Sequence, residues 1–403
     1  MTRGIVTRRT RGVVGASLLL LASIPASGAA QQPLLGAGGL SISPTAQALQ
    51  FTTPVRQDSL LIRGVQQVVL PLTVRGTLPG SWNLEIAGGY TQARIETGPA
   101  SAPAQLELRG PTDTRVRIYG PLLRDVLQLN AAVNVPTGLV NLDAEQFAVL
   151  RTVAAPALAM PAPVLGGGLG GTVGLSGAYR RGDWAFGGGL SHEVRTRFTP
   201  VEAALVGSVS SASLTPAAVT RSSVAATRIL GRQQLSVVAG LDSYGSDLVE
   251  ATIGNRRESV SYRLGATRSI AGIWHVTNVL VRSIDVTGSL RQRAAFTDGR
   301  GQLAEGSDGT YGDLSVRLGV GHPRRAGVDI IGELRRQSGL DIDPTIATAG
   351  VDAIGGGAVL RVPAGTVLWR IAARAEQGTL HTGLQRAPFR AASLTISVGP
   401  RNR

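Results

Sequence analysis

Residues 312–321 read Gly-Asp-Leu-Ser-Val-Arg-Leu-Gly-Val-Gly, a stretch in which every second residue is Leu or Val. Successive side chains of an extended chain point to opposite faces, so Leu314 and Val316 share one face, while Asp313 and Arg317 share the other. The same period of two recurs in 82–90, 125–135, 259–270 and 367–375. This period is typical of β-strands. The sequence therefore predicts many strands that each have one apolar and one polar face.

The polar face of these strands is unusually rich in charge, and no helix interrupts the series. Strands of about ten residues with an apolar outer and a polar inner face are typical of transmembrane β-barrels. The longest apolar run after the N-terminal region, Val153 to Leu169, is broken by Pro156, Pro161 and Pro163. A spanning helix needs about 20 uninterrupted apolar residues. Membrane insertion is therefore expected to use strands.

Short and long connections are expected to alternate along the chain. Short turns are predicted near residues 79–81, 121–124, 181–182, 231–232, 271–272, 322–326 and 363–365. Longer, polar connections are predicted near 93–112, 136–171, 197–217, 245–256, 288–309, 339–349 and 379–387. Barrels with short periplasmic turns and long external loops alternate in this way.

Counting strands between these connections gives sixteen, with a first strand near Ala46 to Val55 and a last near Phe389 to Gly399. Twelve and fourteen are the alternatives. The predicted fold class is all-β, an antiparallel transmembrane β-barrel of about 16 strands with one short helix in a long external loop. An interior of that width exceeds what side chains fill.

The four tryptophans are expected at one depth of this barrel. Trp82, Trp184, Trp274 and Trp369 each follow a predicted short turn by a few residues. Indole rings are enriched at membrane–water interfaces, because the ring is apolar and its N–H needs a polar partner. The four residues are therefore predicted to mark the periplasmic interface.

Residues 1–30 have the pattern of a cleaved signal peptide. Arg3, Arg8, Arg9 and Arg11 precede the apolar run Val13 to Ile24. That run is too short for a comfortable spanning helix, and small residues follow it. Export is expected, with residues 31–45 as a periplasmic lead-in and 46–403 as the barrel.

Composition excludes several function classes. All 40 basic residues are Arg, and cysteine is absent. A P-loop lysine, a Schiff base and thiolate chemistry are therefore ruled out. The formal net charge is +14, yet the arginines are spread singly and only 4% of residues are aromatic, which argues against nucleic-acid binding. No metal-ligand spacing is present, and we predict no cofactor and no metal.

Four histidines provide no expected catalytic residue, so no enzyme is predicted. Ser191 and His192 are neighbours in a strand and therefore face opposite sides. His275 and Asp285 are expected at opposite ends of one strand.

Two sets of residues are the predicted functional positions. The polar face is expected to line the lumen with Arg75, Glu85, Arg115, Arg117, Arg195, Arg263, Asp285, Asp313, Arg317, Asp329, Glu333, Arg335, Arg370 and Arg374.

In the connection 136–171, Asp143 and Gln146 form a capping-box pattern that begins a helix. Its stripe Phe147, Leu150 and Val153 is expected to form a constriction against the inner wall near strand 125–135. A loop packed on the barrel rim is the alternative.

These features together resemble outer-membrane porins and transporters. The segment Asn134-Val135-Pro136-Thr137-Gly138 at a strand end is similar to a motif of the meta-pathway phenol-degradation outer-membrane family, relatives of long-chain fatty-acid transporters. One departure is the C-terminus, because such barrels usually end in an aromatic residue and this chain ends in Asn402-Arg403. This difference argues against the predicted last strand, or against its recognition by the insertion machinery.

The expected function is an outer-membrane channel for passive diffusion of small solutes, with a lumen weakly selective for anions. One alternative is a transporter of hydrophobic or aromatic compounds, and a second is a structural or adhesion barrel. The expected partners are outer-membrane lipid, a small-molecule solute and the outer-membrane insertion machinery.

Overall fold

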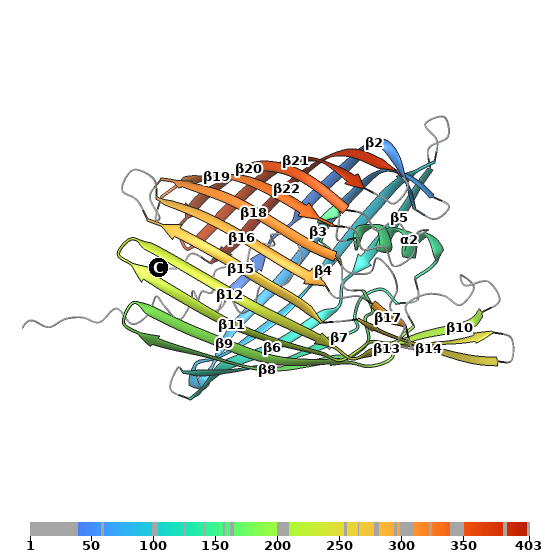
Figure 1. Ribbon diagram of the computed structural model, residues 1–403, viewed down its shortest axis with the longest axis horizontal. Helices are drawn as coiled ribbons and strands as arrows, with labels where there is room; N and C mark the ends of the chain where they lie inside the picture. Colours follow the sequence, from blue (N-terminus) through green and yellow to red (C-terminus); the bar gives the residue numbers. More distant parts are fainter. Residues whose placement is uncertain are drawn as a thin grey trace, which may run out of the picture.

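In the computed structural model the chain forms a closed antiparallel β-barrel (Figure 1). The structure describes residues 39–57, 60–98, 104–123, 126–140, 142–155, 158–161, 165–199, 209–253, 256–264, 266–277, 282–293, 296–298, 309–321, 325–338, 350–381 and 385–400. The predicted signal peptide and most of the lead-in lie outside these residues. Among the described residues, no helix is both long and apolar enough to span a membrane.

The barrel wall contains sixteen strand positions, which confirms the predicted fold class. Two positions are each shared by two consecutive strands, β1 (Gly39–Ile42) with β2 (Thr45–Gln57), and β5 (Ala104–Pro111) with β6 (Thr114–Leu123). The remaining wall strands are β3 (Leu60–Leu78), β4 (Trp82–Thr97), β7 (Leu127–Val135), β8 (Gly170–Arg181), β9 (Trp184–Arg195), β11 (Val219–Leu230), β12 (Gln233–Tyr244), β15 (Thr267–Val276), β16 (Ser283–Arg293), β18 (Gly309–Val320), β19 (Gly327–Gln337), β20 (Gly350–Ala364), β21 (Val367–His381) and β22 (Arg386–Pro400).

The last strand closes the barrel. β22 pairs with β21 on one side and with β1 and β2 on the other, with Ile42 opposite Val398 and Phe51 opposite Phe389. The strand expected near Phe389 to Gly399 is therefore part of the wall.

The two barrel ends differ in their connections. The 3-10 turn η1 (Pro79–Ser81) and the other short turns lie at one end, here called the short-turn end. The opposite loop end carries the long connections and the helix α2 (Ala144–Val153) (Figure 1). One predicted short turn was wrong, because Ala271 and Gly272 lie inside β15. The predicted connection 93–112 was also too long, since β4 continues to Thr97 and β5 begins at Ala104.

A second, four-stranded sheet projects from the loop end. It contains β10 (Val209–Thr215), β13 (Ser246–Ile253), β14 (Arg256–Leu264) and β17 (Phe296–Asp298). The expected single strand 259–270 is therefore divided between β14 in this sheet and β15 in the wall. The alternation continues through both strands, so periodicity alone did not reveal the boundary.

The outer face of the barrel is apolar over a limited band. On β3, Val68, Leu70, Leu72 and Val74 are 43–48% exposed, whereas the alternate residue Gln67 is 2% exposed. Towards the loop end, polar pairs replace the apolar residues, with Gln66 Nε2 3.4 Å from Glu96 Oε1, Gln92 Nε2 2.7 Å from Glu107 Oε1, and Arg94 Nε 3.5 Å from Glu107 Oε2. An exposed apolar band bounded by polar side chains is the surface that a bilayer covers in such barrels.

All four tryptophans lie on the outer face near the short-turn end. Trp82 and Trp184 begin β4 and β9, Trp369 is the third residue of β21, and Trp274 is the third residue from the end of β15. Trp274 therefore precedes its turn instead of following one. The ring of Trp82 covers Gly120 of β6, where a β-carbon would collide with the indole. The Arg228 guanidinium lies 5.4 Å from the Trp184 ring centroid.

Candidate functional site

The inner face of the wall carries the charged side chains. On β3, β4 and β6, Arg75 Nε lies 2.7 Å from Glu85 Oε2, and Glu85 is opposite Arg117 in the strand register. Arg117 donates from Nε to Asn130 Oδ1 at 2.7 Å, and its guanidinium lies 4.7 Å from the Tyr119 ring centroid. An ion pair between β3 and β4 and a hydrogen bond between β6 and β7 therefore connect neighbouring strands in this part of the lumen.

The part of the wall formed by β19, β20 and β21 is built in the same way. Arg374 Nη1 of β21 lies 2.9 Å from Glu333 Oε1 of β19, so this ion pair spans the intervening strand β20. Arg335 pairs with Glu376 over the same strand, where Gly355 lies opposite Glu376. Contacts across an intervening strand require both side chains to lie on one face, and a glycine leaves room for them.

The strand register places most of the predicted lumen residues on this inner face. They are Arg75, Glu85, Arg115, Arg117, Arg195, Asp285, Asp313, Arg317, Asp329, Glu333, Arg335, Arg370 and Arg374. Arg263 is the exception, because it lies in β14 of the four-stranded sheet and not in the wall. Whether these positions contact a permeating solute remains a prediction.

Glu193, which alternates with Arg195 on the predicted polar face, also lies on the inner face. Several other inner-face charges were absent from the predicted set, namely Arg221, Asp242, Arg291, Arg361 and Glu376. The same alternation, carried further along β16 and β21, identifies Arg291 and Glu376. Arg221, Asp242 and Arg361 lie in β11, β12 and β20, from which no residue was predicted. Across both sets, arginines outnumber carboxylates on the inner face.

The long β7–β8 connection packs inside the loop end of the barrel. Its helix α2 begins as predicted, since Asp143 Oδ1 accepts from the Gln146 N–H at 2.8 Å and Gln146 Oε1 accepts from the Asp143 N–H at 3.2 Å. The loop's buried apolar residues are Leu142, Val149, Val153, Leu158 and Met160. Their partners on the wall are Leu49, Val55, Ile62, Val65, Ala93, Ile95, Leu108, Val351, Ala353, Leu380, Ala387 and Phe389.

The loop therefore lies against a continuous part of the wall, from β20 through β22 and β2 to β5. This corrects the expected contact near strand 125–135. The buried helix positions are Val149, Thr152 and Val153, while Leu150 is partly buried and Phe147 is 36% exposed. Phe147 does not belong to the packed stripe, because the helix is rotated towards Val149.

A single carboxylate fastens both ends of this loop. Asp113, between β5 and β6, accepts at Oδ1 from the N–H of Gly138 at 2.9 Å and of Gly166 at 2.8 Å. Its Oδ2 accepts from the N–H of Gly167 at 2.8 Å. Gly166 has φ 52°, a conformation that disfavours other residues. Charge-assisted bonds of this kind are stronger than neutral ones. Asp113 therefore closes the neck of the loop.

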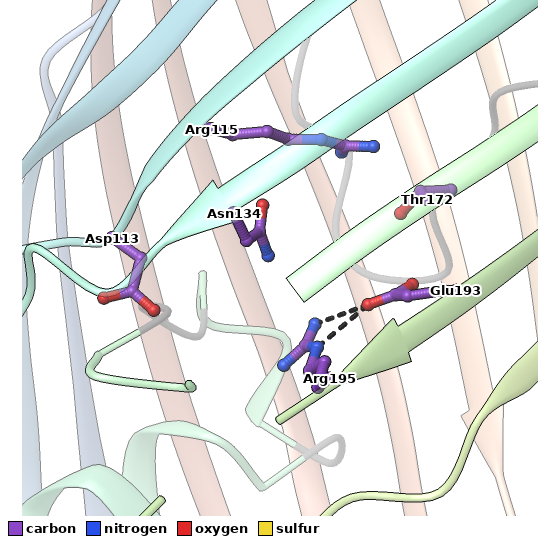
Figure 2. A pocket seen from close by; sticks show the side chains of 6 residues that line it. All are labelled: Asp113, Arg115, Asn134, Thr172, Glu193 and Arg195. Carbon is purple, nitrogen blue, oxygen red and sulfur yellow. Dashed lines mark hydrogen bonds and ion pairs between the residues drawn. The ribbon is translucent and has the colours of Figure 1, made fainter. Parts of the chain in front are cut away.

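A polar cavity of about 190 Å³ lies beside this neck, lined by Asp113, Arg115, Asn134, Thr172, Glu193 and Arg195. Figure 2 shows Arg115, Asn134, Thr172, Glu193 and Arg195 on β6, β7, β8 and β9, and Asp113 on the connection between β5 and β6. Glu193 accepts from Arg195 Nη2 at 2.8 Å and from Arg221 Nη1 at 2.7 Å. Both carboxylates of the cavity are thus already engaged, so the cavity presents mainly hydrogen-bond donors.

The histidines take positions that sequence reasoning partly missed. His192 lies on the outer face, with Nδ1 2.9 Å from Thr220 Oγ1. His275 and Asp285 are register partners on β15 and β16 and are hydrogen-bonded, which corrects their expected separation. His275 Nε2 also lies 3.2 Å from Thr277 Oγ1. The misplaced turn at 271–272 hid this contact, because it assigned both residues to one strand.

No protein-family model matches the chain, and no curated protein matches it. Solved structures similar in fold include OpdK of Pseudomonas aeruginosa crystallised with vanillate, at 10% identity over 89% of this chain and 98% of that chain, with a TM-score of 0.42. OprB of Pseudomonas putida has 8% identity over 90% of this chain and 94% of that chain, with a TM-score of 0.45. An anion-selective porin from Comamonas acidovorans has 13% identity over 90% of this chain and 99% of that chain, with a TM-score of 0.37. At these scores the likeness identifies neither a family nor a solute.

Proposed function

We propose that this chain is an outer-membrane channel for passive diffusion of small solutes, with a lumen that favours anions. The observation that carries the proposal is the inner face, where arginines outnumber carboxylates in a barrel of sixteen wall strands. A barrel of that size leaves an aqueous lumen, and rings of fixed charge bias permeation by sign. The β7–β8 loop packs against the wall from β20 to β22 and from β2 to β5. It therefore narrows the lumen at the loop end from one side.

The alternative of a hydrophobic-compound transporter depends on the apolar run 153–165. Val153, Leu158 and Met160 in that run are 0%, 5% and 4% exposed, because they pack against the wall. A hydrophobic solute needs accessible apolar surface, so this packing favours the polar channel. The second alternative is a structural barrel in which ion pairs such as Arg374–Glu333 fill the lumen.

Conductance in a planar bilayer tests the proposal. The purified protein should insert as discrete ion-conducting events. A variant in which residues 142–165 are replaced by a short Gly/Ser linker should conduct more, because the loop is removed from the mouth. Its barrel should be less stable than the parent, since the loop buries a large apolar cluster.

Two results would contradict the channel. Insertion without current in either protein would favour the structural barrel. Facilitated uptake of an apolar compound into liposomes, without ion current, would favour the transporter.

A further inference from the structure

Three arginines surround one buried aspartate at the short-turn end of the lumen. Asp329 of β19 has a side chain only 1% exposed. Its Oδ2 lies 2.7 Å from Arg317 Nη2 of β18, and its Oδ1 lies 3.2 Å from Arg361 Nη2 of β20. Arg282, just before β16, also pairs with Oδ1. One negative charge is thus shared by three positive charges.

A fourth arginine increases the imbalance. Arg370 of β21 is the register partner of Arg361, so two like charges face each other on adjacent strands of the inner face. Like charges in directly opposite positions destabilise a sheet. Arg317 and Arg282 add further positive charge around Arg370, and Asp329 is the carboxylate that acts against it. Asp285, the other carboxylate next to Arg317, is already bonded to His275.

Two glycines make room for the guanidinium groups. A β-carbon at Gly319 of β18 would collide with Arg282 Nη2. A β-carbon at Gly327 of β19 would stand 2.7 Å from Arg361 Nη2. Both glycines have ordinary backbone angles. Their role is therefore to leave space for the guanidinium groups, and not to adopt a special conformation.

Part of the donor capacity of this cluster is unused. The Nε atoms of Arg282, Arg361 and Arg370 are buried and have no hydrogen-bond acceptor among the described residues. A buried charged donor without an acceptor costs free energy. The group therefore combines excess positive charge with several donors that point away from solvent but lack partners.

We propose that Arg282, Arg317, Arg361 and Arg370 form a binding site for a small multivalent oxyanion, one that carries phosphate or paired carboxylate groups. Guanidinium groups bind such oxygens through parallel, charge-assisted hydrogen bonds. An oxyanion on the lumen side of this cluster accepts from the guanidinium groups of Arg282 and Arg317, whose side chains are 22% and 39% exposed, and offsets the repulsion between Arg361 and Arg370. The site deepens the proposed channel function and rests on it for the route by which the anion arrives.

Thermal unfolding of the detergent-solubilised protein tests the site without requiring conduction. Inorganic phosphate and succinate are titrated separately against chloride at matched ionic strength. We expect a saturable rise in Tm with at least one of the two oxyanions and none with chloride. Arg370→Gln should weaken the apparent Kd by at least about ten-fold. In chloride alone the same variant should unfold at an equal or higher temperature, because a repulsion is removed.

The matched control is Arg374→Gln, which removes an inner-face arginine of the same strand that is already paired with Glu333. It should keep the oxyanion Kd within about two-fold. A rise with phosphate alone or succinate alone supports the site and assigns its ligand. Equal Tm in all three salts, or unchanged binding in Arg370→Gln, overturns it. Oxyanion binding without bilayer conductance would contradict the proposed channel and support the site. Bilayer conductance without oxyanion binding would contradict the site and support the channel.

Discussion

The side chain of Leu139 lies directly over Gly110 on the inner wall. A β-carbon at Gly110 would stand 2.5 Å from Leu139 Cγ, so only glycine accommodates the first turn of the loop at this point of β5. The contact explains why the loop rests against β5 and not against β7. It also defines a position at which loop placement can be changed without altering a charge.

Gly110→Val should displace Leu139 and loosen the loop, because the added side chain occupies the same space. We expect larger and noisier single-channel currents, with barrel stability lowered by roughly 1–3 kcal/mol, as is usual for overpacking. Gly189→Ala is the control, since a β-carbon on this inner-face glycine finds its nearest neighbour at 3.5 Å. Unchanged currents in Gly110→Val would mean that the loop does not limit conduction.

Asp113→Asn should weaken the neck of the loop. The neutral amide has one acceptor oxygen for three N–H groups, so about 2 kcal/mol of loop stabilisation should be lost. Arg151 is the only arginine between residues 139 and 165, so trypsin cleavage after Arg151 reports loop opening. Cleavage should be faster in the variant. Asp247→Asn makes the same carboxylate-to-amide change outside the barrel, at the acceptor of the Ala217 N–H, and should leave the rate at Arg151 unchanged.

Charge reversal at Arg115 in the cavity, or at Arg221, which pairs with Glu193 of the cavity, should change ion selectivity. Arg115→Glu and Arg221→Glu each replace an inner-face positive charge by a negative one, so the reversal potential in a salt gradient should shift towards cation preference. Arg263→Glu makes the same change in the four-stranded sheet and should have little effect. An equal shift in all three variants would indicate a general surface effect and not a lumen effect.

The tryptophans should report one depth in the bilayer. Trp184, Trp274 and Trp369 are 41%, 42% and 42% exposed on the outer face near the short-turn end. Lipids brominated close to the headgroup should therefore quench their fluorescence more than lipids brominated near the chain terminus. Stronger quenching by the deeper bromines would place this end of the barrel inside the hydrocarbon region and contradict the predicted interface.

Periodicity predicted the wall because each wall strand repeats the same local pattern. It was unable to identify the sheet to which a strand belongs. Arg263 and Thr267 continue one alternation, yet the chain moves from the four-stranded sheet to the barrel wall between them. That change depends on pairing partners far away in the sequence, and a local pattern does not contain them.

The loop was predicted in its position and its helix start, but not in its rotation. The capping box at Asp143 and Gln146 is local chemistry and was correctly recognised. The choice of Val149 over Phe147 as a buried position depends on the space left by Leu108 and Ile95 on the wall. The spacing of apolar residues along the helix allowed either Phe147 or Val149 to be the buried position.

The common anchorage of Gly138 and Gly166 at Asp113 makes the segment between them an exchangeable module. Because its two ends meet at one point of the rim, its length and composition can change while the strands on either side keep their register. Related chains, or an engineered library, could therefore vary the aperture by substituting this segment alone. The shape of the mouth would then evolve through this segment and the wall residues that pack against it, while the strand register stays the same.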